Sequence, residues 1–387
     1  MHASFTNIVW KHSTIYFDAR LGELNKKLWI QLPNGVHRPE DDLIAGALAT
    51  LVGPNLASLT LELTISPSIK ASIEEFCSCP VEASVGGATI DWRSEYSSKH
   101  AVSFSGGFDS LAAHRLLPQP AALVSMDFGG WFQRETDFFS SFDTNIVSTN
   151  FRMEGFGRRS WMFMLSGIIL LKKHLDIGSF TTGSILESSP WHYRRNIDSA
   201  FKAPPFLQAY GLDQINTTIG ITEVCTTLLS MRYYPDQIVE SLKSLAAPGT
   251  GKSLRKRLLI EVLALKSEDE FPGLPEVAYP DSPPLVWGQS LTDDMLTPYL
   301  IKNLGIRNAS RLMAGIPAEI ETFATNSKLN FYERYHPGLY NGIPADNYQY
   351  LMLEFAGANI YPFNELDWTE YRALSSILSY YHEIKLD

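Results

Sequence analysis

The sequence has little cysteine, no long apolar run and a shortage of positive charge. Its three cysteines among 387 residues, Cys77, Cys79 and Cys225, are too few for a disulfide framework and suit a reducing compartment. No run approaches the roughly 20 apolar residues of a membrane span, and residues 1–10 contain no apolar signal core. We therefore expect a cytoplasmic protein without a membrane partner. The formal net charge of −10 also makes nucleic acid an unexpected partner, because an acidic surface repels a phosphate backbone.

The residues that are present can form a core of substantial size. Apolar residues make up 45% of the chain and charged residues 19%, which is typical of folded globular proteins. A chain of this length exceeds one typical domain. We expect an N-terminal α+β domain over 1–99, a central domain over 100–266 and a mostly helical region over 267–387.

Residues 1–99 combine strand and helix patterns. The segments 14–17, 27–31 and 59–65 have the composition of strands, and Leu32-Pro33-Asn34-Gly35 has turn chemistry. The spacing of Leu43, Ala47, Leu48 and Leu51 predicts an amphipathic helix over 41–52.

The central region alternates between short apolar strands and helices, which predicts an α/β fold with a doubly wound parallel sheet. In such sheets ligands bind at the carboxyl ends of the strands. The expected strands are 101–104, 121–128, 145–148 and 179–183, and the expected helices are 109–117, 135–142 and 159–174.

The segment Ser105-Gly106-Gly107-Phe108-Asp109-Ser110 lies between an expected strand and an expected helix. Two glycines allow backbone N–H groups to approach an anion, and the helix N-terminus directs its positive dipole end to the same point. Asp109 would repel phosphates unless a cation lies between them, so we expect Mg²⁺ there. The alternative is a tight Gly-Gly turn in which Asp109 caps the helix.

These six residues resemble the SGGxDS signature of the PP-loop (N-type) ATP pyrophosphatases. That resemblance implies an adenine-nucleotide α-hydrolase-like (HUP) fold and cleavage of ATP to AMP and pyrophosphate. Within the superfamily, Gly157-Arg158-Arg159-Ser160 is similar to the PGRN segment of 7-cyano-7-deazaguanine synthases (QueC family), and Thr182-Gly183-Ser184 is similar to that family's glycine at a strand end. The chain also resembles QueC-like proteins of antiphage defence clusters.

The resemblance implies roles for particular residues. Asp109, Ser110 and Arg158 would be catalytic, with Asp109 holding Mg²⁺. Glu187, His192 and Arg194 would face the substrate, although the segment 188–194 departs from the family's pattern. The residues expected to bind ATP are Ser103, Ser105, Gly106, Gly107, Phe108, Asp109, Ser110, Met126, Asp127 and Gly183.

A second glycine-containing segment, residues 246–253, fits a relaxed Walker A pattern. It follows an expected helix over 236–245, whereas a Walker loop must follow a strand, so we do not interpret it as one. It resembles the zinc knuckle of QueC-like chains with Thr250 and Ser253 in place of cysteines. Hydroxyls do not hold zinc as thiolates do, so we expect no zinc site.

The implied activity is that of an adenylate-forming ligase. A carboxylate or carbonyl oxygen, such as that of a 7-deazaguanine derivative or of an acid carried by a protein, would attack the α-phosphate, and ammonia or an amine would then displace AMP. The competing hypothesis is a nucleotide-binding scaffold or regulatory subunit without turnover. In either case the aromatic-rich region that contains residues 331–336 suggests a docking surface for a partner protein.

Overall fold

The computed structural model describes residues 1–86, 92, 97, 99–193, 203–247, 249–267, 270–277 and 279–384. The chain forms two compact units, and neither is continuous in sequence. Unit 1 comprises Met1–Ser105, Gln119–Thr182 and Lys202–Ile215, and unit 2 comprises Gly106–Pro118, Gly183–Phe201 and Asn216–Asp387. The segment 105–110 therefore changes units within its own length, because Ser105 belongs to unit 1 and Gly106 to unit 2.

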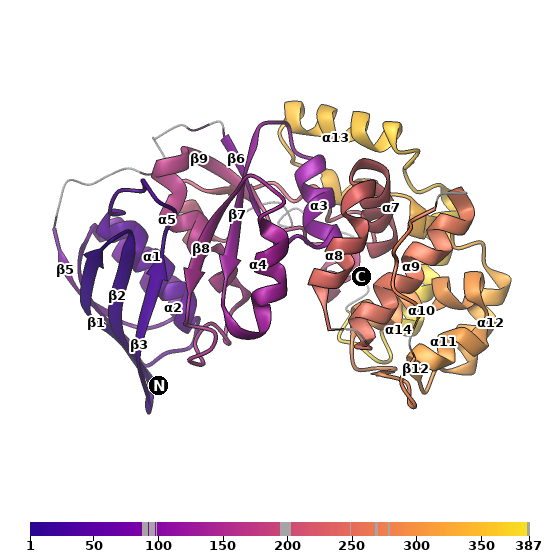
Figure 1. Cartoon of the computed structure of the whole chain (residues 1–387), viewed down its shortest axis with the longest axis horizontal. Helices are drawn as coiled ribbons and strands as arrows, with labels where there is room; N and C mark the ends of the chain where they lie inside the picture. Colours follow the sequence, from indigo (N-terminus) through magenta and orange to yellow (C-terminus); the bar gives the residue numbers. More distant parts are fainter. Residues whose placement is uncertain are drawn as a thin grey trace. The chain divides into compact units, whose positions relative to one another are not determined.

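Unit 1 is built on one ten-stranded sheet, whose strand order is β10-β9-β6-β7-β8-β3-β2-β1-β4-β5 (Figure 1). The strands are β1 (His2–Lys11), β2 (Thr14–Leu21), β3 (Leu24–Gln31), β4 (Ser58–Ile65), β5 (Val81–Val85), β6 (Lys99–Ser103), β7 (Ala121–Asp127), β8 (Thr144–Thr149), β9 (Ile177–Thr181) and β10 (Asp213–Gln214).

Half of this sheet has the topology of a doubly wound fold. Strands β6 to β10 are mutually parallel. From β8 to the sheet edge at β10, their order is β8-β7-β6-β9-β10. That order reverses between β6 and β9, and such a reversal is the point where doubly wound sheets bind ligands. The predicted parallel α/β sheet is confirmed at this level.

The N-terminal strands extend the same sheet. Strands β1, β2 and β3 are antiparallel to one another, and β3 joins β8 through the pairs Ile30–Thr149 and Gln31–Ser148. Asn150 reinforces the junction, since its amide accepts from the N–H of Trp29 at 3.0 Å and donates to the carbonyl of Lys27 at 3.1 Å. The strands on both sides of this junction therefore share one sheet.

Helices cover the sheet of unit 1. They are α1 (Asp41–Val52), α2 (Pro67–Cys77), α4 (Gln133–Phe139), α5 (Ser166–Leu175) and α6 (Pro205–Gln208). Helices α1 and α5 pack against each other, and α5 packs on β7. A Cβ on Gly167 would lie 2.8 Å from the sulfur of Met126, so glycine permits this close approach.

The long helix that we expected over 159–174 is wrong in its first part. Residues 161–165 form a 3₁₀ helix, and α5 begins only at Ser166. Ser160 accepts a hydrogen bond from the N–H of Met162 at 3.1 Å, which caps the tighter turn where the α-helix was expected to start.

Unit 2 is mostly helical. Its described helices of more than four residues are α3 (Phe108–Arg115), α7 (Glu223–Tyr233), α8 (Ile238–Leu245), α9 (Gly251–Ser267), α10 (Leu291–Leu304), α11 (Ile306–Leu312), α12 (Ala318–Asn326), α13 (Ala345–Gly357) and α14 (Glu365–Leu378). Helix α7 packs against both α3 and α9. Two short parallel strands, β11 (Leu285–Val286) and β12 (Met313–Ala314), complete the unit.

The aromatic stretch 331–336 lies in the interior of unit 2. Phe331 and Tyr332 are completely buried, and the ring of Phe331 contacts the rings of Phe363 and Tyr371. These rings form part of a core, and a docking surface elsewhere in the aromatic-rich C-terminal region stays a prediction. Among the described residues, no helix has both the length and the apolar character needed to cross a bilayer.

Candidate functional site

Two hydroxyl groups donate hydrogen bonds to backbone carbonyls of the segment 106–109. The carbonyl of Gly106 accepts from the hydroxyl of Ser241 on α8 at 2.7 Å, and the carbonyl of Phe108 accepts from Ser230 on α7 at 3.0 Å. In the described part of the chain, no protein group accepts a hydrogen bond from the N–H groups of residues 106–109. Buried N–H groups seldom lack an acceptor, so this arrangement suits an anion at the start of α3.

Glycine is required at two positions around this segment. Gly106 has φ +74°, which is a left-handed conformation that side chains disfavour. Gly183 has φ +69°, and a Cβ there would lie 3.0 Å from the carbonyl carbon and oxygen of Asp109. The close contact between Gly183 and α3 brings together two residues that the sequence analysis assigned to one site.

Asp109 takes part in a buried charged cluster, which we define as Asp109, Glu223, Arg255, Lys256 and Asp293. The ammonium of Lys256 lies 3.1 and 3.2 Å from the two carboxylate oxygens of Asp109 and 2.6 Å from Glu223. Arg255 contacts Glu223 at 2.8 Å and also pairs with Asp293. Three carboxylates thus face two cations, which leaves one net negative charge.

Burial makes the cluster electrostatically strong. The side chains of Lys256 and Glu223 are each 1% exposed, whereas that of Asp109 is 32% exposed. Burial disfavours the ammonium of Lys256, but the carboxylates of Asp109 and Glu223 outweigh it and raise its pKa. Burial likewise favours the neutral acid at Glu223, yet Arg255 and Lys256 lower its pKa to about 2. Both groups are therefore charged at neutral pH.

The hydroxyl of Thr226 completes the surroundings of Asp109. It donates to Oδ1 of Asp109 at 2.5 Å, so this oxygen accepts from both Thr226 and Lys256. The sequence analysis called for a cation next to Asp109 and suggested Mg²⁺. The structure shows a protein cation, Lys256, in contact with both carboxylate oxygens.

Glu187 is connected to this cluster through the start of α7. Its Oε1 accepts from the N–H of Glu223 at 2.6 Å, while its Oε2 is buried and has no hydrogen-bond partner among the residues that the structure describes. Burial raises the pKa of Glu187 to about 8, and the carboxylates of Glu223 and Asp109 add to this. Glu187 therefore acts as a mainly protonated acceptor at the N-terminus of α7 at neutral pH.

The other expected site residues have different surroundings. The hydroxyl of Ser110 donates to the carbonyl of Gly107 at 2.9 Å. His192 is buried, with Nδ1 3.0 Å from the carbonyl oxygen of Leu186, and burial lowers its pKa. Arg194 lies outside the described residues.

In unit 1, three expected ATP-binding residues meet at the carboxyl ends of adjacent parallel strands. Ser103 ends β6, and Met126 and Asp127 end β7. Asp127 already accepts from the N–H of Gly129 and from the hydroxyl of Thr136, each at 2.9 Å. Ser105 follows β6 by two residues, and Arg158 is exposed in unit 1.

The sequence analysis missed the partners of Asp109. Lys256, Glu223 and Thr226 are not among the site residues that the sequence predicts. One signal was available: Arg255, Lys256 and Arg257 stand between Leu254 and the apolar residues that begin at Leu258, and a base on the apolar face of a helix would need a buried carboxylate beside it.

Few side chains in the described structure are placed to ligate a metal ion. No group of three or more His, Cys, Asp or Glu side chains among the described residues could hold one. A single carboxylate together with nucleotide phosphates is a normal Mg²⁺ environment, so Asp109 fits that type of site. Comparisons with protein-family models, with curated proteins and with solved structures found no match for this chain.

Proposed function

We propose that this protein is a PP-loop-type ATP pyrophosphatase that binds the pyrophosphate of ATP at the start of α3. One observation carries the proposal: among the described residues the N–H groups of 106–109 have no protein acceptor, and the carbonyls of Phe108 and Gly106 accept from Ser230 and Ser241. This backbone follows the first strand of a parallel sheet whose order reverses at that strand. The HUP fold and the likeness to QueC are part of the proposal.

Each group near Asp109 has a role in this proposal. The N–H groups and the helix dipole would stabilise negative charge on the departing pyrophosphate. Lys256 would neutralise Asp109, so that the carboxylate does not repel the phosphates. Mg²⁺, when bound, would supply further positive charge between Asp109 and the phosphate oxygens. The substrate oxygen that attacks the α-phosphate would belong to a carboxylic acid or a 7-deazaguanine derivative.

The first experiment is ³¹P NMR of the protein with Mg-ATP, 7-carboxy-7-deazaguanine and ammonium. The proposal expects AMP and pyrophosphate from the wild type and strongly reduced formation in Asp109→Asn. Asp236→Asn makes the same change at an exposed residue near the start of α8 and is the matched control. Formation of ADP and phosphate would contradict cleavage between the α- and β-phosphates.

A nucleotide-binding scaffold is the second candidate, and one observation favours it. Asp109 has a structural role, because it connects α3 to Thr226 on α7 and to Lys256 on α9. Its presence therefore does not require catalysis. Calorimetry separates the two candidates: a scaffold would bind ATP with millimolar or better affinity and release neither AMP nor pyrophosphate with any acid and amine supplied.

A further inference from the structure

A pocket of about 560 Å³ lies within unit 2, at the C-terminal ends of α7 and α9. Its volume is in the range of sites that bind small molecules. Lys256 and Lys266 are separated by about ten residues of α9, so the pocket is about 15 Å along the helix from the contacts of Asp109, at 1.5 Å per residue. It is therefore separate from the charged cluster.

Half of the residues that line the pocket are apolar. Leu228 and Met231 contribute from α7, Leu263 contributes from α9, and Ala358 follows α13. Met231, Leu263 and Ala358 are at most 7% exposed, so they belong to the packed interior of the unit. This wall suits the hydrocarbon part of a ligand.

One carboxylate in the lining is held in a fixed orientation. Oε1 of Glu333 accepts from the hydroxyl of Tyr299 at 2.8 Å and also pairs with Lys266. The ammonium of Lys266 lies 5.0 Å from the centroid of the Tyr299 ring, which further fixes the pair. Among the described residues, no group donates a hydrogen bond to the second oxygen of Glu333, and its side chain is 32% exposed. This oxygen can accept from a ligand.

The lining also contains an exposed cation, Arg232. Arg232, in the last turn of α7, has no carboxylate within ion-pair distance in the part of the chain that the structure describes. Its guanidinium lies 5.9 Å from the ring of Tyr233. A planar guanidinium is well suited to bind a carboxylate through two parallel hydrogen bonds.

We propose that this pocket binds an apolar α-amino acid. The ligand's carboxylate pairs with Arg232, its ammonium pairs with the second oxygen of Glu333, and its side chain packs on Leu228, Met231 and Leu263. The lining contains two cations, Arg232 and Lys266, and two carboxylates, Glu270 and Glu333, so a ligand that carries both charges matches it better than a simple anion or a simple cation does. A zwitterion with a hydrocarbon side chain satisfies both charges and the wall together. The inference is independent of the activity proposed at Asp109.

The test is isothermal titration of the full-length protein with L-leucine, L-methionine and L-phenylalanine. We expect at least one to bind with a dissociation constant of about 1 mM or lower. N-acetyl-L-leucine lacks the ammonium and L-leucinamide lacks the carboxylate. We expect each to bind at least about tenfold more weakly than leucine, because a hydrogen bond to a charged group is lost. No heat from all three amino acids, or equal affinity for the blocked analogues, would overturn the proposal.

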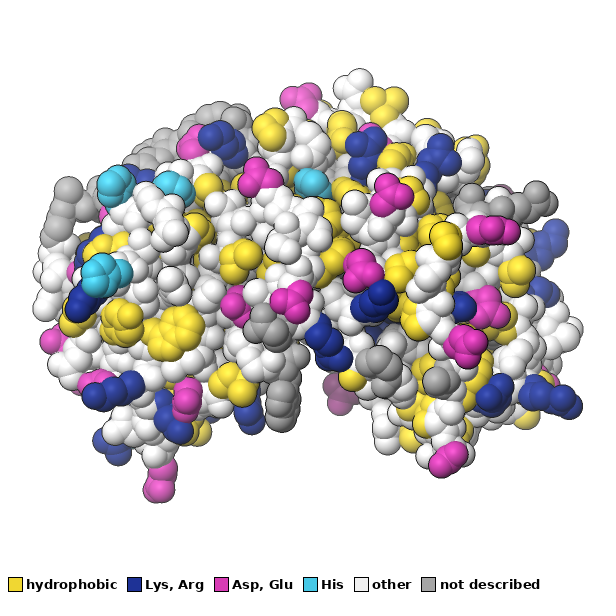
Figure 2. All heavy atoms as spheres, viewed as in Figure 1, with side chains coloured by type: hydrophobic (Ala, Val, Ile, Leu, Met, Phe, Trp, Pro, Cys, Tyr) yellow, Lys and Arg dark blue, Asp and Glu magenta, His cyan; other side chains and the backbone are white. Residues whose placement is uncertain are grey.

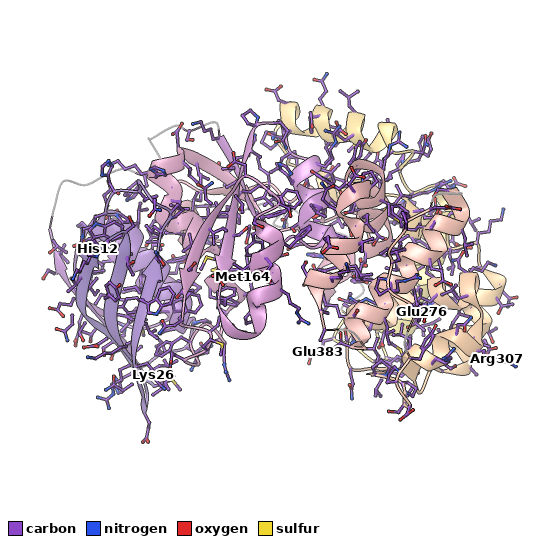
Figure 3. All side chains as sticks on the ribbon, in the orientation of Figure 1. His12, Lys26, Met164, Glu276, Arg307 and Glu383 are labelled. Carbon is purple, nitrogen blue, oxygen red and sulfur yellow. The ribbon has the colours of Figure 1, made fainter. Side chains whose placement is uncertain are left out.

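Two variants assign the binding to this pocket. Arg232→Gln should reduce leucine affinity about tenfold or more and leave the weak leucinamide binding unchanged. Arg307→Gln makes the same change on α11, where Arg307 is exposed, and should bind leucine as the wild type does (Figure 3). Wild-type affinity in Arg232→Gln would place the amino acid elsewhere and overturn the proposal. Circular dichroism checks that both variants fold.

Discussion

Replacing Lys256 with methionine tests how strongly the charged cluster stabilises unit 2. The methionine side chain is similar in length to that of lysine but carries no charge. The change removes the cation that lies 3.1 Å from Asp109 and 2.6 Å from Glu223. Two carboxylates then lose one partner, although Arg255 still contacts Glu223 at 2.8 Å.

The expected magnitude follows from the exposure of each partner. Removing one partner of a buried ion pair costs about 3–5 kcal/mol, because a buried charge is left uncompensated. Glu223 is 1% exposed and would experience this cost in part, since Arg255 remains. Asp109 is 32% exposed, and water would screen much of its charge. We therefore expect a loss of about 3 kcal/mol in the free energy of unfolding, at the lower end of that range.

The assay is urea unfolding at pH 7, followed by far-ultraviolet circular dichroism. The control is Lys243→Met, which removes an exposed ion pair with Glu240 whose side chains are 54% and 61% exposed. Such a surface pair contributes at most about 1 kcal/mol. If Lys256→Met destabilised the protein no more than Lys243→Met does, the cluster would not have the role that we infer from its burial.

The loss of stability in Lys256→Met should depend on pH. The pKa of Glu223 is lowered from 4.5 to about 2, so its contribution is present above pH 4.5 and is lost as the pH falls toward 2. Lys256→Met removes part of that contribution. The difference in stability between wild type and variant should therefore shrink as the pH is lowered from about 5 to about 3. A difference that stays constant over this range would contradict the assignment to Glu223.

Two further predictions concern the surroundings of the cluster. Gly183→Ala should destabilise the protein by about 2–3 kcal/mol and Gly315→Ala by about 1 kcal/mol. Both glycines have a positive φ, but only a Cβ at Gly183 would approach Asp109. Equal losses of stability in urea unfolding would mean that this contact is unimportant. Glu187→Gln should raise stability relative to wild type by more at pH 8 than at pH 5. The pKa of Glu187 rises from 4.5 to about 8 on folding, so its contribution to the stability of the wild type is complete below pH 4.5 and is lost as the pH rises to 8. The same difference in stability between variant and wild type at both pH values would argue against a protonated Glu187.

Much of the fold could be predicted from local patterns. The helix predicted over 41–52 is confirmed at both ends, because apolar periodicity and terminal residues agree there. Strand β1 was missed. Its pairing with β2 is irregular between Thr6 and Val9, and Asn7 adopts a positive φ of 53°. A bulge of this kind interrupts the alternation of apolar and polar residues on which sequence-based strand assignment depends.

Contacts between distant segments could not be predicted in the same way. The pairing of β3 with β8 joins residues about 120 positions apart, and no local pattern specifies which strand edges meet. The site shows the same limit. Loop chemistry identified Asp109, whereas its partner Lys256 lies 147 residues later and reaches it only because α9 packs against α7. The predicted domain limits at residues 99 and 266 stay predictions.

The surface of unit 2 carries charges of both signs. On the face drawn in Figure 2, acidic and basic side chains are interspersed over the helices of unit 2. Interspersed charges of this kind do not form the single-sign field that steers a highly charged partner.

The charge balance of the cluster decides whether ATP binding should need a metal. Lys256 already contacts both oxygens of Asp109, so Asp109 alone does not demand Mg²⁺. However, the cluster carries one net negative charge, and a pyrophosphate group adds several more near the same helix. One helix N-terminus supplies only about half a positive charge, which is too little to compensate them. We therefore expect calorimetric affinity for ATP to fall at least about tenfold when Mg²⁺ is removed with EDTA. Equal affinity without metal would show that Lys256 and the backbone suffice, and it would remove Mg²⁺ from the proposed site.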